Sequence, residues 1–377
     1  LSCAYFLARL GYSPRVFEAE PRPGGMLVQA IPAYRLPREE LAREVRMIEH
    51  LGVTIDTGRA LGRDFTLDAL REQGYEAVFL AIGAPQGVPL DLPGAHAHGV
   101  TEAMAFLRQY NIRGSVPVGK RVVVIGGGNA AIDAARTAIR LGAESVTVIY
   151  RRTREEMPAY AEEIEEALHE GVTLRTLAHP EAFEVEDGRV TGLRLRAMKL
   201  GEFDRSGRRR PEGDGATACE VLPADQVIVA IGQALDKKAF AGGVEVARNE
   251  RGWIKADPRT GATPLPWLFA GGDAVTGPSS VVEAIAAGER AAVAIDKLFT
   301  GSEHAFWRGY SDQGTAFDPY ADPVAYAREK LHTIPLEKRR QNFAEVEMPW
   351  SEATALRQAK RCLRCDYGKQ PCECENA

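Results

Sequence analysis

Residues 121–152 read RVVVIGGGNAAIDAARTAIRLGAESVTVIYRR, and this stretch decides the fold. Residues 121–125 form a short apolar, β-branched run that predicts a buried strand. Apolar residues at helical spacing from Ile132 to Leu141 predict a helix, and residues 146–150 predict the next strand. A glycine turn between strand and helix is the setting in which a GxGxxA sequence indicates dinucleotide binding.

The glycine turn has the residue types that a pyrophosphate site needs. Gly126 permits the tight turn, Gly128 lets the backbone approach the pyrophosphate, and Ala131 lets the helix pack closely on the strand. The start of the helix offers free N–H groups and the positive end of the helix dipole to the phosphates. The alternative interpretation is a tight turn that holds no ligand.

The end of the second strand favours one coenzyme over the other. An NAD site places Asp or Glu about 20 residues after the first glycine, where the carboxylate binds the ribose 2′-hydroxyl. Here the sequence has Arg151 and Arg152, with Arg154 just beyond, and guanidinium groups suit a 2′-phosphate. We therefore expect NADPH rather than NADH. The alternative is a solvated turn in which these arginines pair with Glu155 and Glu156.

Composition bounds the possible partners and the compartment. The chain has 377 residues, enough for two or three domains, and its net charge of −5 gives no indication of a nucleic-acid partner. It has no apolar run of about 18 residues, so no membrane span is expected. Of six cysteines, Cys3 and Cys219 are expected to be buried thiols, and four crowd between residues 362 and 374. This crowding favours a metal site over a disulfide framework, and therefore a reducing compartment, the cytoplasm.

The first residues resemble the second half of another dinucleotide-binding unit. Residues 1–10 predict a helix, and residues 13–18 predict a strand that ends at Glu18, where a ribose-binding carboxylate belongs. The first strand and glycine motif of that unit are expected before Leu1, which makes the chain part of a longer polypeptide or a fragment. The alternative for Glu18 is an ordinary surface acid.

Later glycine turns repeat the pattern. Strands ending in Ala-Ile-Gly occur at residues 81–83 and 230–232, which indicates two related units and close approach of backbone to a ligand. A strand at 266–270 leads into Gly271-Gly272-Asp273 and then into a long helix at 281–298. Asp273 is placed to accept hydrogen bonds from ribityl hydroxyls, and its alternative role is a helix cap. A further strand is expected at 253–257, and the basic run 208–210 is expected in a solvated hairpin loop.

Several stretches together resemble one protein family. They are GGML at 24–27, IPAYRLP at 31–37, the glycine turn and helix at 126–136, YRRTREEMPA at 150–159, FAGGD at 269–273 and AKRCLRC at 359–365. The set resembles the small (beta) subunit of NADPH-dependent glutamate synthase. The same module is similar to the N-terminal flavin half of dihydropyrimidine dehydrogenase and to the large subunits of ferredoxin:NADP oxidoreductases. The resemblance covers residues 1–300 and the tail.

The resemblance implies an α/β fold with two nested Rossmann-like domains and a C-terminal cysteine-rich helical tail. The FAD-binding domain would comprise residues 1–118 and 264–300, without its first strand and glycine motif, around an NADPH-binding domain at 119–263. Residues 301–377 would form an extension with the cysteine motif. FAD would bind to Glu18, Gly25, Leu27, Arg35, Gly272, Asp273, Ser280 and Val281. NADPH would bind to Gly128, Asn129, Ala130, Arg151, Arg152, Arg154, Ile231 and Gly232.

The cysteine motif predicts a metal centre. Its spacing, C-x2-C-x6-C-x-C over Cys362, Cys365, Cys372 and Cys374, differs from a standard ferredoxin run. The motif follows the flavin module here, whereas the family usually carries its cysteine-rich region ahead of that module. We expect one [4Fe–4S] cluster, in which a partner can supply a ligand; a zinc site is the alternative.

The resemblance implies a function in electron input. Hydride would pass from NADPH to FAD, a step that needs no catalytic acid or base from the protein, and single electrons would then reach an iron–sulfur centre or a partner subunit. The chain is therefore expected to work in a larger redox complex. A disulfide reductase would need a redox CxxC beside the flavin, which Cys3 and Cys219 do not form. The non-enzymatic alternative is a cofactor-binding or assembly subunit.

Overall fold

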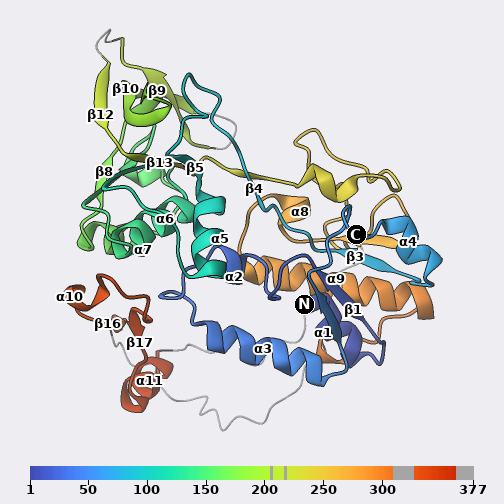
Figure 1. Cartoon of the computed structure of the whole chain (residues 1–377). Helices are drawn as coiled ribbons and strands as arrows, with labels where there is room; N and C mark the ends of the chain where they lie inside the picture. The colour runs from blue at the N-terminus through green and yellow to red at the C-terminus, as the bar shows by residue number, and fades with distance from the viewer. Residues whose placement is uncertain (204–206, 216–218, 309–326, 362–377) are drawn as a thin grey trace.

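The computed structural model describes residues 1–203, 207–215, 219–308 and 327–361 (Figure 1). Its largest sheet has five parallel strands in the order β5-β13-β6-β7-β8. Strands covered on both faces are apolar along their whole length, and residues 122–125 are accordingly all buried. The strands are β5 (Val100–Glu102), β6 (Arg121–Ile125), β7 (Ser145–Ile149), β8 (Thr173–Arg175) and β13 (Gln226–Val229).

Alternate residues of the five-stranded sheet enter two different cores. Val122 and Val124 pack against helices α5 (Ala103–Arg113), α6 (Asn129–Arg140) and α7 (Ala161–His169). Val123 and Ile125 pack on the other face against an antiparallel sheet, which supplies Phe183 and Leu193. That sheet consists of β9 (Ala178–Glu186), β10 (Arg189–Phe203), β11 (Arg209–Gly213) and β12 (Glu220–Pro223). The central sheet is thus a buried layer between helices and a second sheet.

A second unit is formed by segments that precede the five-stranded sheet in the sequence and by segments that follow it. Parallel pairs β1 (Arg15–Glu18) with β2 (Thr54–Thr57) and β3 (Val78–Leu80) with β15 (Leu268–Ala270) form separate two-stranded sheets. Helix α1 (Ser2–Arg9) packs along α9 (Val281–Thr300). A Cβ on Gly288 of α9 would lie 2.7 Å from Ser2 Cβ, so only glycine permits this approach. The unit also contains α2 (Met26–Gln29), α3 (Arg38–His50), α4 (Leu67–Glu72) and α8 (Asp273–Thr276).

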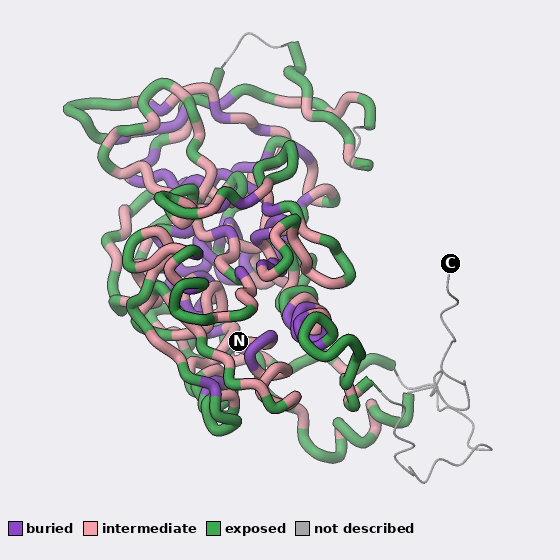
Figure 2. Tube along the Cα trace, turned by 90° about the vertical axis from the view of Figure 1, so that its right-hand side faces the viewer, coloured by how far each residue is buried: buried purple, intermediate pink, exposed green. Residues whose placement is uncertain are grey.

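A short antiparallel ribbon joins the two units. Strand β4 (Gln86–Gly87) pairs with β14 (Gln233–Ala234), and β4 crosses between the units in Figure 1. Each ribbon strand follows one of the Ala-Ile-Gly segments noted in the sequence, so the repeated pattern marks the exit from each parallel sheet. Buried positions gather in the interior of the chain, and exposed positions predominate on the outside (Figure 2).

The C-terminal part that the structure describes is small and packs beside α7. It contains β16 (His332–Thr333), α10 (Leu336–Arg339), β17 (Glu347–Met348) and α11 (Glu352–Ala359), with β16 paired antiparallel to β17. Ser351 caps α11, because its side chain accepts a hydrogen bond of 3.2 Å from the Thr354 N–H. Within the described ranges, three short 3₁₀ turns lie at Arg154–Glu156, Lys237–Phe240 and Phe306–Arg308.

The expected α/β class with parallel sheets is confirmed, and three local predictions are wrong. Residues 253–257 form only an isolated bridge between Arg248 and Ile254, and the Ile254 N–H donates to the Ala274 carbonyl of helix α8. The basic run at 208–210 is partly strand, since β11 begins at Arg209 and pairs with β10. Cys219 is exposed rather than buried and donates to Glu181 at 2.8 Å. Among the described residues, no helix has the length and apolar character that crossing a membrane requires.

Candidate functional site

The glycine turn before α6 has an open side. Gly126 has a φ of 145°, and a Cβ there would lie 2.2 Å from the Ala230 carbonyl oxygen, so the turn requires glycine. A Cβ on Gly128 would meet only Pro158 Cγ, at 4.0 Å, which leaves space beside the turn for a ligand. No side chain caps α6, and its first turn has no acidic residue. Uncapped N–H groups beside open space suit a pyrophosphate.

The end of β13 lies directly beside this turn. Ala230 N–H donates to the Ile125 carbonyl at 2.8 Å, and Gly126 N–H donates to the Ile149 carbonyl at 3.0 Å. The structure therefore brings Ala230, which directly precedes Ile231 and Gly232, against Gly126. Gly232 has a φ of 149°, a conformation that favours glycine.

Residues 153–160 fold over the other side of the turn. Ala159 N–H donates to the Gly127 carbonyl at 3.0 Å, and Tyr160 N–H donates to Asn129 Oδ1 at 3.1 Å. Gly127 must be glycine for the same reason, because a Cβ there would lie 2.5 Å from the Tyr150 ring. The side-chain oxygen of Asn129 thus orders the loop that follows β7.

The three predicted arginines lie in different environments. Arg151 is exposed, and burial together with the Arg151 charge lowers the pKa of His179, which places that guanidinium near the start of β9. Arg152 is buried, and its Nε donates to the Arg209 carbonyl at 2.7 Å. Arg154 pairs with Glu165 of α7. Of the two acids in the alternative interpretation, Glu155 and Glu156, the Glu156 carboxylate accepts from Thr153 and from the Arg209 N–H.

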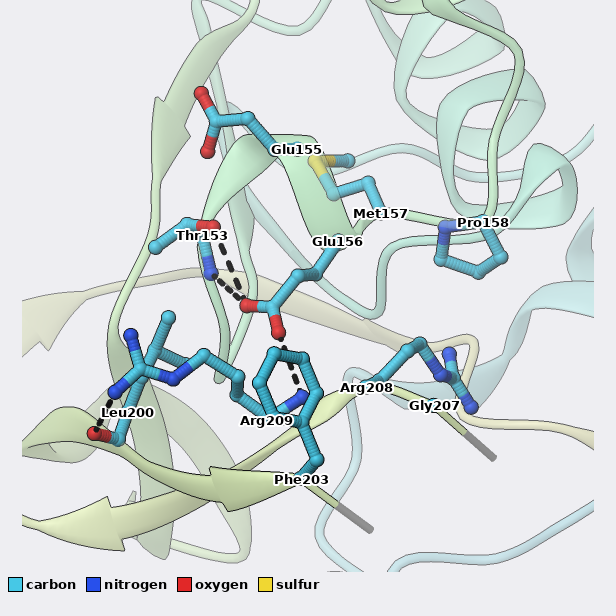
Figure 3. A pocket seen from close by; sticks show the side chains of 10 residues that line it. All are labelled: Thr153, Glu155, Glu156, Met157, Pro158, Leu200, Phe203, Gly207, Arg208 and Arg209. Atoms are coloured by element: carbon cyan, nitrogen blue, oxygen red, sulfur yellow. Dashed lines mark hydrogen bonds between the residues drawn. The ribbon is translucent and has the colours of Figure 1, made fainter. Parts of the chain in front are cut away.

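A pocket of about 470 Å³ lies between this loop and the β10–β11 hairpin (Figure 3). Glu156 bridges the two walls, because it accepts from Thr153 N–H at 3.3 Å and from Arg209 N–H at 2.9 Å. Pro158 lines both this pocket and the opening beside Gly128, so the two spaces are neighbours. The lining residues are Thr153, Glu155, Glu156, Met157, Pro158, Leu200, Phe203, Gly207, Arg208 and Arg209.

The second unit has its own glycine turn. Gly24 has a φ of 130°, and a Cβ there would lie 2.8 Å from Val28 Cγ2. The next residue, Gly25, has a φ of 54° and no neighbouring heavy atom within 4 Å of an added Cβ, which leaves its outer side open. Leu27 follows in α2, and its carbonyl accepts from Arg38. Glu18, at the end of β1, accepts from Glu20 N–H at 2.9 Å, and burial raises its pKa.

Asp273 lies at a third glycine turn, before α9. Its Oδ1 accepts from Ser279 N–H at 3.0 Å, and burial raises its pKa. Ser280 caps α9, because its Oγ accepts from Glu283 N–H at 3.2 Å. Gly272 has a φ of 65°, and Val281 at the helix start is exposed. Asp273 therefore orders the loop at the helix start, and its binding to a ligand stays a prediction.

Arg35 lies at the junction of the two units, where its guanidinium pairs with Asp133 at 2.9 Å and with Glu163 at 3.0 Å. Its role in FAD binding stays a prediction. The cysteines Cys362, Cys365, Cys372 and Cys374 lie outside the residues that the structure describes.

Sequence reasoning missed the charged residues on the buried side of α6. Asp133, Arg136 and Arg140 are all buried there. The signal was present in the sequence, because their spacing of three and four residues puts them along one side of a helix that is otherwise rich in alanine.

Comparison with known proteins shows the family to which the chain belongs. The model of the family described as pyridine nucleotide-disulphide oxidoreductase matches residues 1–288. The chain is 43% identical to the NADP(+)-dependent formate dehydrogenase subunit beta of Moorella thermoacetica, covering 97% of this chain and 53% of that protein. It is 40% identical to a putative glutamate synthase [NADPH] small chain of Cereibacter sphaeroides, covering 78% and 73%. It is 35% identical to the NADPH-Fe(3+) oxidoreductase subunit beta of Geobacter sulfurreducens, covering 97% and 59%.

Solved structures share the fold. Mycobacterium tuberculosis FprA in complex with NADPH matches with a TM-score of 0.67 at 19% identity, over 79% of this chain and 83% of that one. Thioredoxin reductase from T. acidophilum matches with a TM-score of 0.57 at 19% identity, over 78% and 93%. The chain spans about half the length of the formate dehydrogenase subunit that it matches. The resemblance inferred from the sequence is confirmed: the chain belongs to the pyridine nucleotide-disulphide oxidoreductase family, and its relatives include glutamate synthase small chains.

Proposed function

We propose that this chain is an electron-input module, which passes hydride from NADPH to FAD and then single electrons to an iron–sulfur centre or a partner subunit. The observation that carries the proposal is the open cradle beside Gly128, with an uncapped helix start on one side and Gly232 on the other. A cradle of this shape accepts a pyrophosphate with backbone N–H groups, which hold it without a charged side chain. The flavin supplies the change from two-electron to one-electron chemistry when it is bound.

The residues of the first module fit this role. We propose that the phosphates of NADPH lie on Gly126, Gly128, Asn129 and Ala130, with Ile231 and Gly232 toward the nicotinamide end. The adenosine end of NADPH then lies toward the loop that follows β7, which contains Arg151, Arg152 and Arg154. No carboxylate occupies the position that binds the ribose 2′-hydroxyl in NAD sites. Arg154 would exchange its pairing with Glu165 for the 2′-phosphate, a partner with more charge.

The second module fits a second dinucleotide. Open space beside Gly25 and the half-buried carboxylates Glu18 and Asp273 suit a ligand with many hydroxyl donors, such as the ribose and ribityl groups of FAD. We assign Leu27, Gly272, Ser280 and Val281 to the same ligand by their place around these turns. We propose that Arg35 contacts FAD in addition to forming its ion pairs with the first module.

The arrangement of the sheets supports a nested pair of domains. We propose an FAD-binding domain at 1–118 and 264–300 around an NADPH-binding domain at 119–263, with the extension at 301–377. Strand β5 belongs to the five-stranded sheet although it precedes residue 119, so the exchange between the domains begins before β6. The β4–β14 ribbon is the connection that the nesting requires.

The tail supports an exit for electrons. Four cysteines lie within residues 362–374, and the relatives include proteins described as beta subunits or small chains. We propose that Cys362, Cys365, Cys372 and Cys374 hold a [4Fe–4S] cluster or contribute to one with a partner, in the reducing cytoplasm. Zinc is the competing occupant for four thiolates.

Two measurements on the native protein that contains this chain test the proposal. Anaerobic mixing with NADPH should bleach the visible absorption of oxidised flavin, whereas a protein without flavin bands would instead be a cofactor-binding or assembly subunit. Replacing Cys362 and Cys365 with Ser should remove iron and acid-labile sulfide together and leave the bleaching by NADPH intact. Zinc without sulfide in the unmodified protein would contradict the role of the tail in electron transfer.

A further inference from the structure

A cluster of buried and half-buried charges connects three separate parts of the chain, and we call it the domain joint. Helices α6 and α7 contribute most of it, the 31–37 segment contributes Arg35, and α10 contributes Arg339. Figure 1 shows α10 beside α7. The members are Arg35, Asp133, Arg136, Arg140, Glu163, Glu166, Glu170 and Arg339.

Glu170 lies at the centre of the domain joint. Its Oε1 accepts from Arg136 Nη2 at 2.7 Å, from Arg140 Nη2 at 2.9 Å and from Arg339 Nη1 at 3.3 Å. The side chains of Glu170 and Arg136 are each 2% exposed, and that of Arg339 is 5% exposed. Arg339 also pairs with Glu166 through Nη1, and its Nε donates to the Ile334 carbonyl at 2.8 Å. Different nitrogens of its guanidinium therefore bind different partners.

The charges of the domain joint sum to zero only when all three parts of the chain contribute. Residues 129–170 supply four carboxylates (Asp133, Glu163, Glu166 and Glu170) and two guanidiniums (Arg136 and Arg140), which leaves a net charge of −2. Arg35 and Arg339 add one positive charge each and bring the total to zero. Buried charge without a partner is strongly unfavourable, so the joint closes only when the 31–37 segment and the C-terminal segment are both docked.

Backbone and aromatic contacts accompany the charges. Val346 is buried, and its N–H donates to the Tyr34 carbonyl at 3.0 Å. Phe343 stacks on Tyr110 of α5 with 4.2 Å between ring centroids. The Arg140 guanidinium lies 3.9 Å from the centre of the Tyr34 ring. The C-terminal segment therefore grips the residue next to Arg35 as well as the helices of the five-stranded sheet.

We infer that residues 327–361 act as a strap that holds the NADPH-binding module against the FAD-binding module, and that Arg339 is the positioning residue that closes the joint. The inference rests on the proposed function. Helix α6 carries the pyrophosphate cradle at its start and the joint along its buried side, and Gly25 precedes Arg35 by only a short segment. The β4–β14 ribbon pairs only two residues from each strand, so the joint is well placed to fix the angle between the modules. Hydride transfer depends steeply on that alignment.

The test uses four variants of the native protein and two readouts. Arg339→Met removes the charge, Arg339→Lys keeps it without the fork, and Glu166→Gln removes one partner at little cost in volume. Arg340→Met is the matched control, because Arg340 is the exposed neighbour and forms no ion pair with a described residue. The readouts are the rate of flavin reduction at saturating NADPH and the hydrogen exchange of the Val346 and Ile334 amides, which bond to Tyr34 and Val346.

Arg339→Met should slow flavin reduction about tenfold or more, with unchanged affinity for NADP⁺ and faster amide exchange at Val346 and Ile334. Arg339→Lys and Glu166→Gln should give intermediate values, and Arg340→Met should match the wild type in both readouts. Faster exchange with an unchanged reduction rate would overturn the positioning role, and unchanged exchange would overturn the strap. If the wild-type protein is not reduced by NADPH, the proposed function fails, and the exchange data still decide whether Arg339 holds the strap.

Discussion

Arg35 donates to both carboxylate oxygens of Asp133, at 3.0 and 2.9 Å, across 98 residues of sequence. Burial raises the pKa of Asp133 to about 6, although the Arg35 charge acts in the opposite direction. This pair links the segment that follows the Gly25 turn to the helix that starts at the Gly128 cradle. The two modules are thus in contact through the buried side of α6, and the proposed ligand site lies at the start of the same helix.

Removing Arg35 should reveal whether this coupling matters for stability. Arg35→Met leaves Asp133 buried without its bidentate partner, and we expect a loss of about 3–5 kcal/mol in the free energy of unfolding. Adding Asp133→Asn should recover part of that loss, as a double-mutant cycle by urea unfolding would show. The flavin content per folded molecule separates the two roles: a pure pairing role leaves it unchanged, whereas a role in FAD binding lowers it.

Coenzyme choice should depend on Arg151. Its guanidinium is exposed beside β7, and a hydrogen bond to a charged group contributes about 1.5–3 kcal/mol. Arg151→Ala should therefore lower kcat/KM for NADPH by about tenfold or more and leave the value for NADH nearly unchanged. Arg152→Ala should lower NADPH use as well, with an added loss of stability, because buried Arg152 also bonds the Arg209 carbonyl. Arg194→Ala, which removes a pair with Glu184 on the antiparallel sheet, is the control, and equal losses with both coenzymes would contradict the prediction.

The sequence predicted the first module well because its signals are local. The run 121–125, the glycine turn and the helical spacing after it depend on neighbouring residues, and β6, α6 and β7 form where the pattern places them. The contact of Gly126 with Ala230 was not predicted, and it follows only from the pairing of β6 with β13 in one sheet. Residues that must be glycine for steric reasons, such as Gly126, were recognisable before the packing was known.

The joint was beyond sequence reasoning because its partners are far apart in the chain. Nothing near Arg339 indicates that its charge balances Glu170, which precedes it by 169 residues. The prediction for Cys219 was wrong because it relied on local sequence alone. Its apolar neighbours suggested burial, but the residue precedes β12, whose first residues are exposed. The burial of Arg152 was likewise not predictable from local sequence. It depends on the β10–β11 hairpin, whose Arg209 carbonyl accepts from Arg152.

Acid should weaken the joint through Glu170. Burial alone would raise the pKa of Glu170, but hydrogen bonds and charges from Arg140 and Arg136 outweigh it and lower the pKa to about 2 from 4.5. A carboxylate with a lowered pKa stabilises the folded state above its unfolded pKa, and this contribution is lost as the pH falls from 4.5 toward 2.

Glu170→Gln should therefore cost about 3 kcal/mol at neutral pH, and the difference from the wild type should shrink as the pH falls through that window. Urea unfolding at a series of pH values measures this difference. Glu165→Gln is the control, because Glu165 pairs with Arg154 at an exposed site and should change stability by less than about 1 kcal/mol. A difference for Glu170→Gln that stays constant down to the lowest pH would contradict the prediction.

Asp273 should decide where the flavin lies. Its carboxylate is half-buried beside Gly272, and only one of its oxygens is used by the Ser279 N–H among the described contacts. The remaining acceptor capacity faces the turn before α9, where ribityl hydroxyls would donate to it. Loss of a hydrogen bond to a charged group costs about 1.5–3 kcal/mol, so Asp273→Ala should weaken FAD binding by about one to two powers of ten.

The matched control for Asp273→Ala is Asp257→Ala. Asp257 also orders a turn, because its Oδ1 accepts from Arg259 N–H at 2.8 Å and from Thr260 N–H at 2.9 Å. Both variants should lose similar stability from the broken turn, and only Asp273→Ala should release flavin more readily in a titration of the native protein. NADP⁺ affinity should stay the same in both, since the cradle at Gly128 belongs to the other module. If the two variants retain FAD equally well, Asp273 serves only to order the loop before Ser280, and the flavin must lie elsewhere.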